Sequence, residues 1–519
     1  MGTASEFRAT LQNPGPRKRF DLESPGLWQL TTQCWRILLI HRKASIRPGL
    51  YALAGLSMAC AMACSPYKVV KNPSPPIAIA DYAKTKNRAQ GEQAWWKHFE
   101  DPQLEKLIQR GLRHNFELRA AWSRLSQARA LLVQAQAGRW PQLSTEASAS
   151  RQRIQTLFGG FENSLYSLSL AASYELDLFD RIGSMTRAAK HDLRATRLDI
   201  EAMALSVSAE IAERWYDLKA TLAQKEQLDA QLKLSEDLEK LVVLRFEEGL
   251  VSALEVHQQR QLTASLRGEN ALLEGSIQTL RNQLAVLVGQ LPQALKTLQV
   301  SAQLPTLKTL PQQGVSGALI HLRPDVRAAQ KRVEAADERI AAAVAARFPS
   351  IRLSGSLGFS AVSIAEVLGN FVWNILGSVS ASLFDGGQQQ AEINRSKAVL
   401  QERLNVYGLT TIRALTEVEN ALIQEKQQQS NIQSLEEQLR LSSDSLNSAR
   451  DNYAQGINDY LTVLSNLRTQ YQMQSSLIRA QRQALSHRIA LHRALGGTWT
   501  SRLKAPKPLS RPSSMAESS

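Results

Sequence analysis

Cysteine is scarce in this chain of 519 residues. Cys34, Cys60 and Cys64 are the only three, and none occurs after residue 64. A disulfide framework and a cysteine-based metal site are therefore excluded from the long body of the protein. All three cysteines lie near the N-terminus, where a targeting signal is expected.

Motifs of the common enzyme classes are missing as well. The sequence has no GxxxxGK or GxGxxG phosphate-binding loop and no HExxH zinc motif. His487 and His492 are five residues apart, a spacing that does not place both rings on one helix face as metal ligands. The sequence therefore predicts a protein that is not an enzyme and that uses no metal and no cofactor.

Aromatic residues make up only 6% of the chain, and glycine and proline are sparse through its middle. This composition favours long helices over an all-β core. The net charge is +15, but residues 1–50 hold eight Lys and Arg against three Asp and Glu, and residues 500–519 hold four against one. No basic cluster remains on the body between them, so nucleic acid is not expected as a partner.

An apolar run at residues 49–63 is about 15 residues long, which is shorter than the ~20 residues of a membrane-spanning helix. Basic residues precede the run, and the small residues at its end, Ala61 and Ala63, lead directly into Cys64. This order is typical of a secretory signal. The ending resembles a bacterial lipoprotein signal, in which Cys64, or alternatively Cys60, becomes the acylated first residue.

The whole chain divides into five predicted parts. They are a leader and lipoprotein signal at 1–63, an acylated, extended, proline-rich arm at 64–92, two repeats at 93–300 and 305–500, and a disordered tail at 501–519. Residues 1–40 precede any signal and indicate either a misassigned start or an unusually long leader.

The body of the chain contains an internal repeat. Five landmarks recur in one order at offsets of 205 to 208 residues: Arg119 with Arg327, Arg139 with Arg347, Leu178 with Leu383, Gly249 with Gly456, and Gly289 with Gly496. So constant a spacing indicates a duplicated unit. The shorter offset from the third landmark onward predicts a length change in a loop.

Each repeat begins with a predicted helix of ~30 residues that leads to an Arg-aromatic-Pro sequence, where the proline ends the helix. The hydrophobic period then changes from 3.6 to 2, which indicates strands. The alternating residues are Leu143, Thr145, Ala147 and Ala149; Tyr166, Leu168, Leu170, Ala172, Tyr174, Leu176 and Leu178; Ile351, Leu353, Leu357 and Phe359; and Trp373, Ile375, Val379, Ala381 and Leu383. They predict two strand hairpins with strands near the length of a membrane β-strand, ~9–11 residues.

The helical period returns after the strands and continues to a glycine tip, Gly249 in the first repeat and Gly456 in the second. Glycine lets the backbone cap a helix or reverse at little steric cost, so each tip joins two long helices into a hairpin. The return helix of the first repeat carries an apolar heptad seam at Leu262, Leu266, Leu273, Ile277, Leu280, Leu284 and Leu287. This seam indicates coiled-coil packing and does not by itself imply transport.

Four strands are too few to close a barrel. Open sheet edges in a membrane would leave backbone groups unpaired, at a cost of several kcal/mol each. Closure therefore needs several copies, and three would supply twelve strands. The sequence therefore predicts a mixed α/β membrane protein with an internal duplication, in which several copies close a β-barrel and long helical hairpins form the rest.

The order of these features resembles the outer-membrane factor family of TolC-like efflux channels, in the lipoprotein (NodT- and OprM-like) branch that serves RND drug pumps. The resemblance covers about residues 64–500. It depends on the Trp-Trp-x-x-Phe-x-Asp-Pro-x-Leu sequence that begins at Trp95, on Tyr174–Arg181 and Ser382–Gly387, and on the Arg-Ala-Leu-Gly-Gly-x-Trp ending at Trp499. It implies a homotrimer in outer-membrane lipid, closed as an outer-membrane β-barrel of four strands per protomer that is continued by a long α-helical coiled-coil barrel. The tunnel of this trimer meets a periplasmic adaptor (membrane fusion) protein and an inner-membrane RND transporter.

The resemblance also implies a gate at the periplasmic end. The family closes this end with hydrogen-bonded links between the hairpin tips and with a ring of aspartates. Glu255 matches the acidic member of such a link, and Tyr453 matches its tyrosine partner.

The family's aspartate ring is absent from its usual places, which hold Thr462 and Ser465 in this sequence. Asp459, or Glu247 and Glu248, could substitute for it. The hypothesis is a constriction formed by three copies of Asp459 and Tyr453. The alternative is that these are solvated residues of the tips.

The function implied is a passive outer-membrane conduit, lipid-anchored and with its helices in the periplasm, that exports small molecules such as drugs from an RND pump. One alternative is a channel for polypeptide secretion with an ABC transporter, and another is a periplasmic coiled-coil adaptor without a pore. The two pairs of alternating strands argue against the adaptor. The sequence does not indicate the substrate, because tunnel walls built from helix faces carry weak selectivity.

Overall fold

The computed structural model of the chain describes residues 66–76, 94–156, 159–307 and 322–506. Contacts divide the chain into two units, residues 1–63 and 64–519, and the fold below is that of the second unit. The predicted signal lies outside the described residues, as do the predicted lipidation sites Cys60 and Cys64.

The first repeat contains two strands between helices. Its elements are η2 (Trp95–Phe99), α3 (Pro102–His114), α4 (Phe116–Ala137), β1 (Gln142–Thr156), β2 (Gly159–Leu176), α5 (Arg181–Glu247), α6 (Ala253–Leu287) and η3 (Pro292–Leu295).

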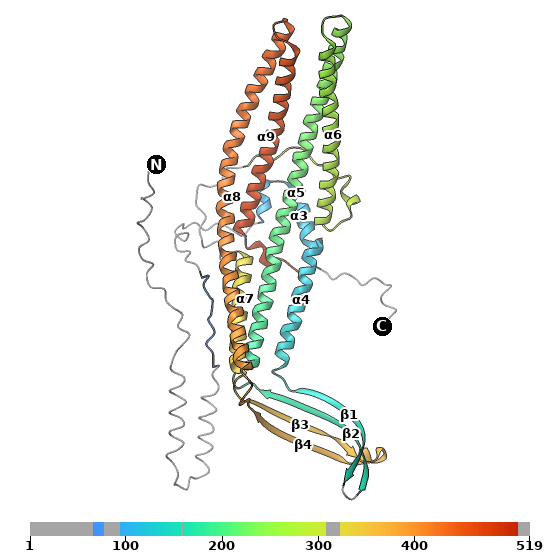
Figure 1. The fold of residues 1–519 in the computed structure, drawn as a ribbon, viewed down its shortest axis with the longest axis vertical. Coiled ribbons are helices and arrows are strands. Elements are labelled where there is room, and N and C mark those ends of the chain that lie inside the picture. The colour runs from blue at the N-terminus through green and yellow to red at the C-terminus, as the bar shows by residue number, and fades with distance from the viewer. Residues whose placement is uncertain (1–65, 77–93, 157–158, 308–321, 507–519) are drawn as a thin grey trace, which may run out of the picture. The chain divides into compact units, whose positions relative to one another are not determined.

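The second repeat follows the same plan. Its elements are α7 (Pro324–Ala345), β3 (Ser350–Ala361), η5 (Ile364–Gly369), β4 (Phe371–Ser380), α8 (Gln388–Ala454), α9 (Tyr460–Leu495) and η6 (Trp499–Arg502). α5 and α8 are each 67 residues long, and α6 and α9 have 35 and 36 residues. The predicted duplication is confirmed, since each repeat is a strand hairpin followed by a long helical hairpin (Figure 1).

The single long helix predicted at the start of the first repeat is wrong, because the chain breaks there into α3 and α4. The break lies at Asn115, whose side chain accepts a hydrogen bond from the Leu118 N–H at 3.0 Å and so caps α4. The same side chain donates to the Leu287 carbonyl of α6 at 3.0 Å. An asparagine that caps one helix and ties it to another favours a helix end over helix continuation.

The four strands form one antiparallel sheet in the order β1-β2-β3-β4. The central pair joins the two repeats, with Leu170 of β2 opposite Leu357 of β3. β1 and β4 are the edges of the described sheet, and β4 is exposed along its whole length. Large side chains such as Trp373 and Ile375, 69% and 72% exposed, thus lie on a surface that one chain does not cover.

Two strands end earlier than the alternating pattern predicted. β2 ends at Leu176, before the predicted strand residue Leu178, and β4 ends before Ala381 and Leu383. After β2, the Asp177 carboxylate accepts hydrogen bonds from the second and third N–H groups of α5, at 3.1 and 2.7 Å. Capping of this kind starts a helix where the apolar alternation alone would extend the strand.

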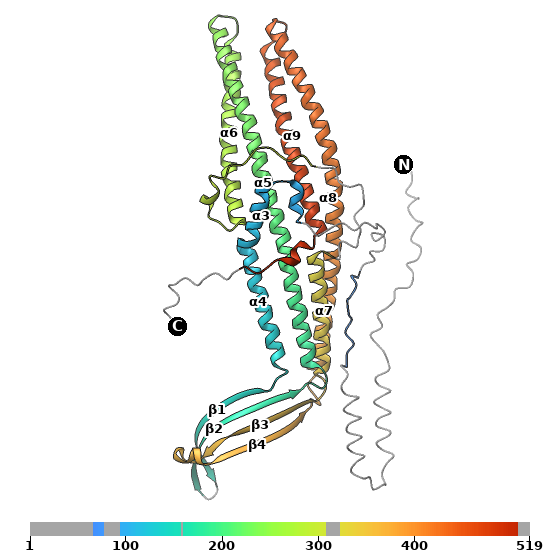
Figure 2. The ribbon, with the colours of Figure 1, turned by 180° about the vertical axis from the view of Figure 1, so that it is seen from behind.

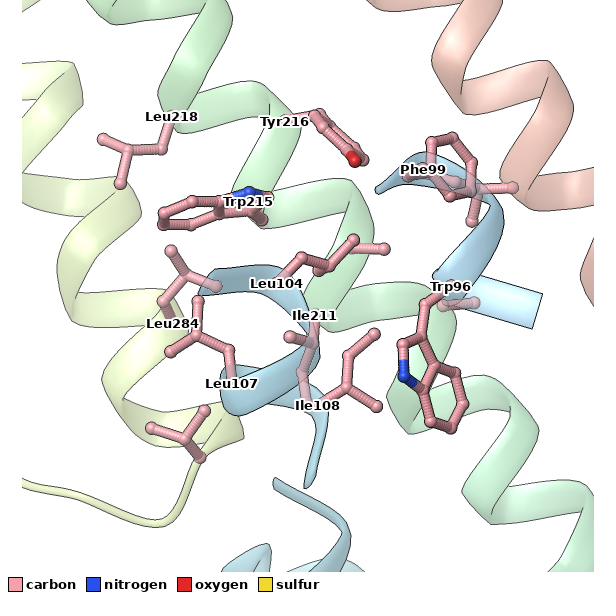
Figure 3. Close-up of a cluster of buried hydrophobic side chains, with 14 of the residues drawn as sticks. Trp96, Phe99, Leu104, Leu107, Ile108, Ile211, Trp215, Tyr216, Leu218 and Leu284 are labelled. Carbon is pink, nitrogen blue, oxygen red and sulfur yellow. The ribbon is translucent and has the colours of Figure 1, made fainter. Parts of the chain in front are cut away.

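The largest buried cluster lies where η2 and α3 pack on α5 and α6 (Figure 3). Trp215 and Tyr216 of α5 are both 0% exposed, and Trp96 of η2 is 5% exposed. The Trp215 indole N–H donates to the Asp101 carboxylate at 2.8 Å. Asp101 thereby joins the start of α3 to the middle of α5.

Part of the predicted arm, residues 66–76, is described, and it contacts α7. The Tyr67 hydroxyl donates to the Asp337 carboxylate at 2.7 Å, and the Val70 N–H donates to the same group at 2.6 Å. This segment has no regular secondary structure, so side-chain hydrogen bonds of this kind are what fix it to the helix.

The predicted start of a disordered tail at residue 501 is too early in the chain. Ser501 belongs to η6, and its carbonyl and that of Leu503 accept hydrogen bonds from Arg197 of α5 at 3.1 and 2.9 Å. Residues 507–519 lie outside the described chain. In the parts of the chain that the structure describes, no helix combines the length and the apolar character needed to cross a membrane.

Candidate functional site

The two helical hairpins reverse at tips remote from the sheet, as two opposite views show (Figure 1 and Figure 2). At the first tip, the Gly249 N–H donates to the Phe246 carbonyl at 2.9 Å and the Leu250 N–H donates to the Arg245 carbonyl at 2.8 Å. These two bonds are a Schellman cap at the end of α5.

The second tip repeats this cap at the end of α8. The Gly456 N–H donates to the Tyr453 carbonyl at 3.1 Å, and the Ile457 N–H donates to the Asn452 carbonyl at 2.8 Å. Gly249 and Gly456 have φ of 69° and 74°, a left-handed conformation that favours glycine. Both predicted tip glycines therefore lie at chain reversals of the same geometry.

The structure brings Glu255 and Tyr453 together across the two hairpins. Tyr453, in the last turn of α8, donates its hydroxyl to a carboxylate oxygen of Glu255, in the first turn of α6, at 3.2 Å. The Arg245 guanidinium lies 4.9 Å from the centre of the Tyr453 ring. Burial and then the negative charge of Glu255 raise the pKa of Tyr453, while Arg245 acts in the opposite sense, so Tyr453 is a hydrogen-bond donor at neutral pH.

The hydrogen bonds of the Asp459 side chain go to Thr462 and not to Glu255 or Tyr453. Asp459 is the N-cap of α9, and its carboxylate accepts from the Thr462 N–H at 2.9 Å and from the Thr462 hydroxyl at 2.7 Å. The hydroxyl bond and then the N–H bond lower the pKa of Asp459. Asp459 is therefore an exposed, ionised cap at the second tip.

The positions of the family's aspartate ring hold hydroxyl groups that are bonded within α9. The Ser465 hydroxyl donates to the Thr462 carbonyl at 3.0 Å. Glu247 and Glu248, the other predicted substitutes, are exposed at the end of α5. The only carboxylate that the structure places at the start of α9 is thus Asp459.

A second polar contact between the hairpins lies directly behind the first and was not predicted from the sequence. Tyr460, the first residue of α9, donates its hydroxyl to the side-chain carbonyl of Gln259 in α6. Tyr460 is 4% exposed and Gln259 is 0% exposed. A sequence signal existed, because Glu255, Gln259 and Thr263 follow one another at intervals of four and so lie on one face of α6.

The described residues contain no group of three or more His, Cys, Asp or Glu side chains that could hold a metal ion. The tips present exposed apolar side chains as well as polar ones. Leu250 and Leu254 at the first tip are 67% and 63% exposed, and Ile457 and Leu461 at the second are 66% and 55% exposed. The tips therefore combine hydrogen-bonded links with exposed apolar side chains.

A family model, curated proteins and solved structures that resemble this chain all describe outer-membrane proteins. A family model described as "Outer membrane efflux protein" matches residues 107–290 and 315–497. The pyoverdine export outer membrane protein OpmQ of Pseudomonas putida is 30% identical over 454 residues, which cover 84% of this chain and 95% of that protein. The toluene efflux pump outer membrane protein TtgC of Pseudomonas putida is 30% identical over 455 residues, 84% of this chain and 93% of that protein.

A solved structure agrees with these relatives. The outer-membrane channel OprN superposes with a TM-score of 0.77 at 27% identity, over 84% of this chain and 99% of that chain.

Proposed function

The chain belongs to the outer membrane efflux protein family, and we propose that it is the outer-membrane channel of a tripartite efflux system. In this role it is a passive conduit that exports small molecules delivered by an inner-membrane RND transporter and a periplasmic adaptor. The relatives named for pyoverdine export and toluene efflux support small organic molecules as the substrate class. The proposal assigns the chain no catalytic step, cofactor or metal.

One observation carries the proposal: a sheet with two unpaired edges is joined at its base to two long helical hairpins. Because each strand runs opposite to its neighbour, β1 and β4 run in opposite directions. β4 of one copy can therefore pair antiparallel with β1 of the next. Three copies would then close a twelve-stranded barrel, which removes every open edge from the membrane. The helices would continue this barrel as a tunnel through the periplasm.

The exposed apolar residues of the tips support a partner at the periplasmic end. The test is a mild crosslink in living cells, followed by purification of the tagged chain and identification of bound proteins. An RND transporter with an adaptor is the expected result. An ABC transporter would instead favour polypeptide secretion, and a lone soluble chain outside the outer-membrane fraction would contradict the channel itself.

Paired variants locate that partner surface. Leu250→Ser together with Ile457→Ser should greatly reduce recovery of the adaptor, because both exposed apolar side chains of the tips are lost. Leu272→Ser is the matched control, since Leu272 is 74% exposed on α6 but far along the helix from the tip. Equal recovery from the tip variant and the control would contradict docking at the tips.

The lipid anchor is proposed at Cys64, with Cys60 as the alternative. Tyr67, three residues after Cys64, is fixed to α7 through Asp337, so an acyl chain on Cys64 would hold this part of the protein near the membrane. Metabolic labelling with palmitate should be lost in Cys64→Ala and kept in Cys60→Ala. The reverse pattern would move the anchor to Cys60.

The periplasmic gate is proposed at Glu255, Tyr453 and Asp459, with Gly249 and Gly456 forming the reversals. Tyr453→Phe removes the hydroxyl that bonds Glu255, and we expect the leak of purified channels in a planar bilayer to rise about fivefold per link broken. Asp459→Asn removes the charge but keeps a good N-cap, so it tests the constriction without unwinding α9. Unchanged conductance and leak in both variants would contradict this gate.

A further inference from the structure

The two hairpins are joined by a second hydrogen-bonded crossing that contains no charge. It links Tyr460 of α9 to Gln259 of α6, residues that are 201 positions apart in the chain. Tyr460 belongs to an apolar cluster that also contains Val256, Leu464 and Leu467, and Gln259 is fully buried. The tip link between Glu255 and Tyr453, by contrast, is charged on one side and partly exposed.

The first hairpin holds Gln259 in one orientation. The Gln259 amide nitrogen donates to the Ser235 carbonyl at 2.7 Å and to the Ser235 hydroxyl at 2.9 Å. The Ser235 hydroxyl in turn lies 3.0 Å from the Thr263 hydroxyl. Because the amide nitrogen is engaged within α5 and α6, the Gln259 carbonyl oxygen is left to face the second hairpin.

The tilted pair of Tyr453 and Tyr460 connects the two crossings, with ring centres 5.6 Å apart. One side chain reaches Glu255 and the other reaches Gln259, which lies one helical turn farther from the tip on α6. Tyr453 and Tyr460 also flank the Gly456 reversal. Movement of the second tip therefore acts on both crossings.

The apolar cluster that contains Tyr460 borders a cavity between the hairpins. This cavity of about 530 Å³ is lined by α5, α6 and α9, with Gln231, Arg468 and Tyr471 among its residues. Polar crossings follow at this cavity and beyond it, where Gln231 donates to Gln474 at 3.0 Å and Arg482 donates to Asp217 at 2.6 Å. The Gln259–Tyr460 bond thus lies between the tip link and these crossings.

We propose that Gln259 and Tyr460 form a buried, uncharged latch that holds the two hairpin tips together behind the Glu255–Tyr453 link. The inference rests on the proposed channel function and adds a regulating pair to the same gate. A buried hydrogen bond is costly to break, because each partner then lacks both its bond and water. Opening of the tips therefore needs a partner that either supplies this energy or lets water reach the latch.

Tyr460→Phe tests the latch with the loss of a single oxygen atom. In planar bilayers, purified full-length channels carrying this change should leak about fivefold more per latch broken. Tyr471→Phe is the matched control, because it removes a hydroxyl on the same helix that only approaches the Gln231 carbonyl at 3.5 Å. An equal leak in Tyr460→Phe and in the wild-type channel would overturn the proposal.

A combination of variants separates a latch from a general loosening of the tips. Gln259→Leu combined with Tyr460→Phe should leak no more than Gln259→Leu alone, because both changes break the same bond. Adding Tyr453→Phe should multiply the leak, because it breaks a different link. If the leak of the Gln259→Leu and Tyr460→Phe double variant rose by the product of the two single increases, a direct Gln259–Tyr460 bond would be contradicted.

A chemical bridge provides the reverse experiment. The chain contains no cysteine after Cys64, so Gln259→Cys with Tyr460→Cys supplies the only thiols of the helical body. This double variant should leak more than the wild type, and a short bis-maleimide should restore the low leak. Failure of the bridge to reduce the leak would overturn the latch, whereas a wild type that forms no channel at all would contradict the proposed function instead.

Discussion

One buried charge pair joins the two helices of the second hairpin. Arg488 of α9 donates from Nε to the Glu425 carboxylate of α8 at 2.9 Å, and the two side chains are 9% and 1% exposed. A buried charge that loses its partner retains the full cost of its desolvation. Removing one partner of this pair should therefore lower the free energy of unfolding more than the intact pair raises it.

Arg488→Met should lower the free energy of unfolding by about 3–5 kcal/mol, because Glu425 is left buried and unpaired. Arg440→Met is the control, since Arg440 and its partner Glu437 are 60% and 57% exposed and solvent screens such pairs. Denaturant unfolding of the purified protein in detergent measures both. A similar loss in the two variants would contradict the role of burial.

A second prediction at this scale concerns His492. Its ring is stacked on those of Trp95 and His98, with centres 5.7 and 5.3 Å apart. Burial lowers the pKa of His492 to about 3, and His98 and Arg488 act in the same direction. Between about pH 6.5 and pH 3, the unfolded chain therefore binds a proton that the folded chain does not, and stability falls as the pH falls through this window.

His492→Phe keeps an aromatic ring in the stack but removes the titrating group, so the loss of stability below pH 6.5 should become shallower by up to several kcal/mol, at about 1.4 kcal/mol per pKa unit. Thermal unfolding across this pH range is the measurement. His257→Phe, at an exposed position of α6, is the control for replacing an imidazole with a phenyl ring. A slope that His492→Phe does not alter would show that other groups set the acid response.

At the scale of the elements, the pairing of β2 with β3 depends on a glycine. A Cβ atom added at Gly358 of β3 would lie 2.1 Å from the Leu168 carbonyl oxygen and 2.6 Å from the Ser169 Cα of β2. Backbone atoms cannot move aside as a side-chain end can. The strand contact that joins the two repeats therefore requires the absence of a side chain here.

Gly358→Ala should destabilise the assembled protein by about 1–3 kcal/mol per chain through overpacking. Gly355→Ala is the matched control in the same strand, because the nearest atom to its added Cβ lies 3.5 Å away, an ordinary contact. The measurement is the temperature at which the purified oligomer dissociates. Equal dissociation temperatures would show that β2 and β3 can separate enough to admit the methyl group.

At the scale of the whole molecule, the two edges of the sheet must find partners in another copy. β1 and β4 are exposed edges of the described sheet, and unpaired edges of this length are avoided in folded proteins. The proposed ring of copies would pair β1 of one with β4 of the next. The barrel is then a property of the assembly and not of the chain.

Cysteine pairs across this contact test the ring. Ser148→Cys in β1, combined in turn with Asn374→Cys, Ser378→Cys or Ser380→Cys in β4, should give an intermolecular disulfide in at least one combination, because opposed strand residues come within bonding range. The expected product on a non-reducing gel is a covalent trimer. Ser148→Cys with Ser448→Cys of α8 is the control, and a crosslink there, or none in any β1–β4 pair, would contradict the arrangement.

The sequence by itself determined the elements and their order. Alternation with period 2 and with period 3.6 depends on near neighbours, so it predicted the four strands and the two long hairpins. The reversals at Gly249 and Gly456 were also predictable, because a left-handed cap is decided within about six residues. The pairing of Glu255 with Tyr453 spans 198 residues, and it was foreseen only through the family resemblance.

Only the tertiary structure decided which distant groups meet. The break at Asn115 depends on the Leu287 carbonyl of another helix, and the contact of Tyr460 with Gln259 depends on how two hairpins pack 201 residues apart in sequence. No local pattern specifies such a partner, because the choice is made by the energy of burying polar groups together. The chain therefore encodes its helices and strands locally, and its latch and its junctions only through packing.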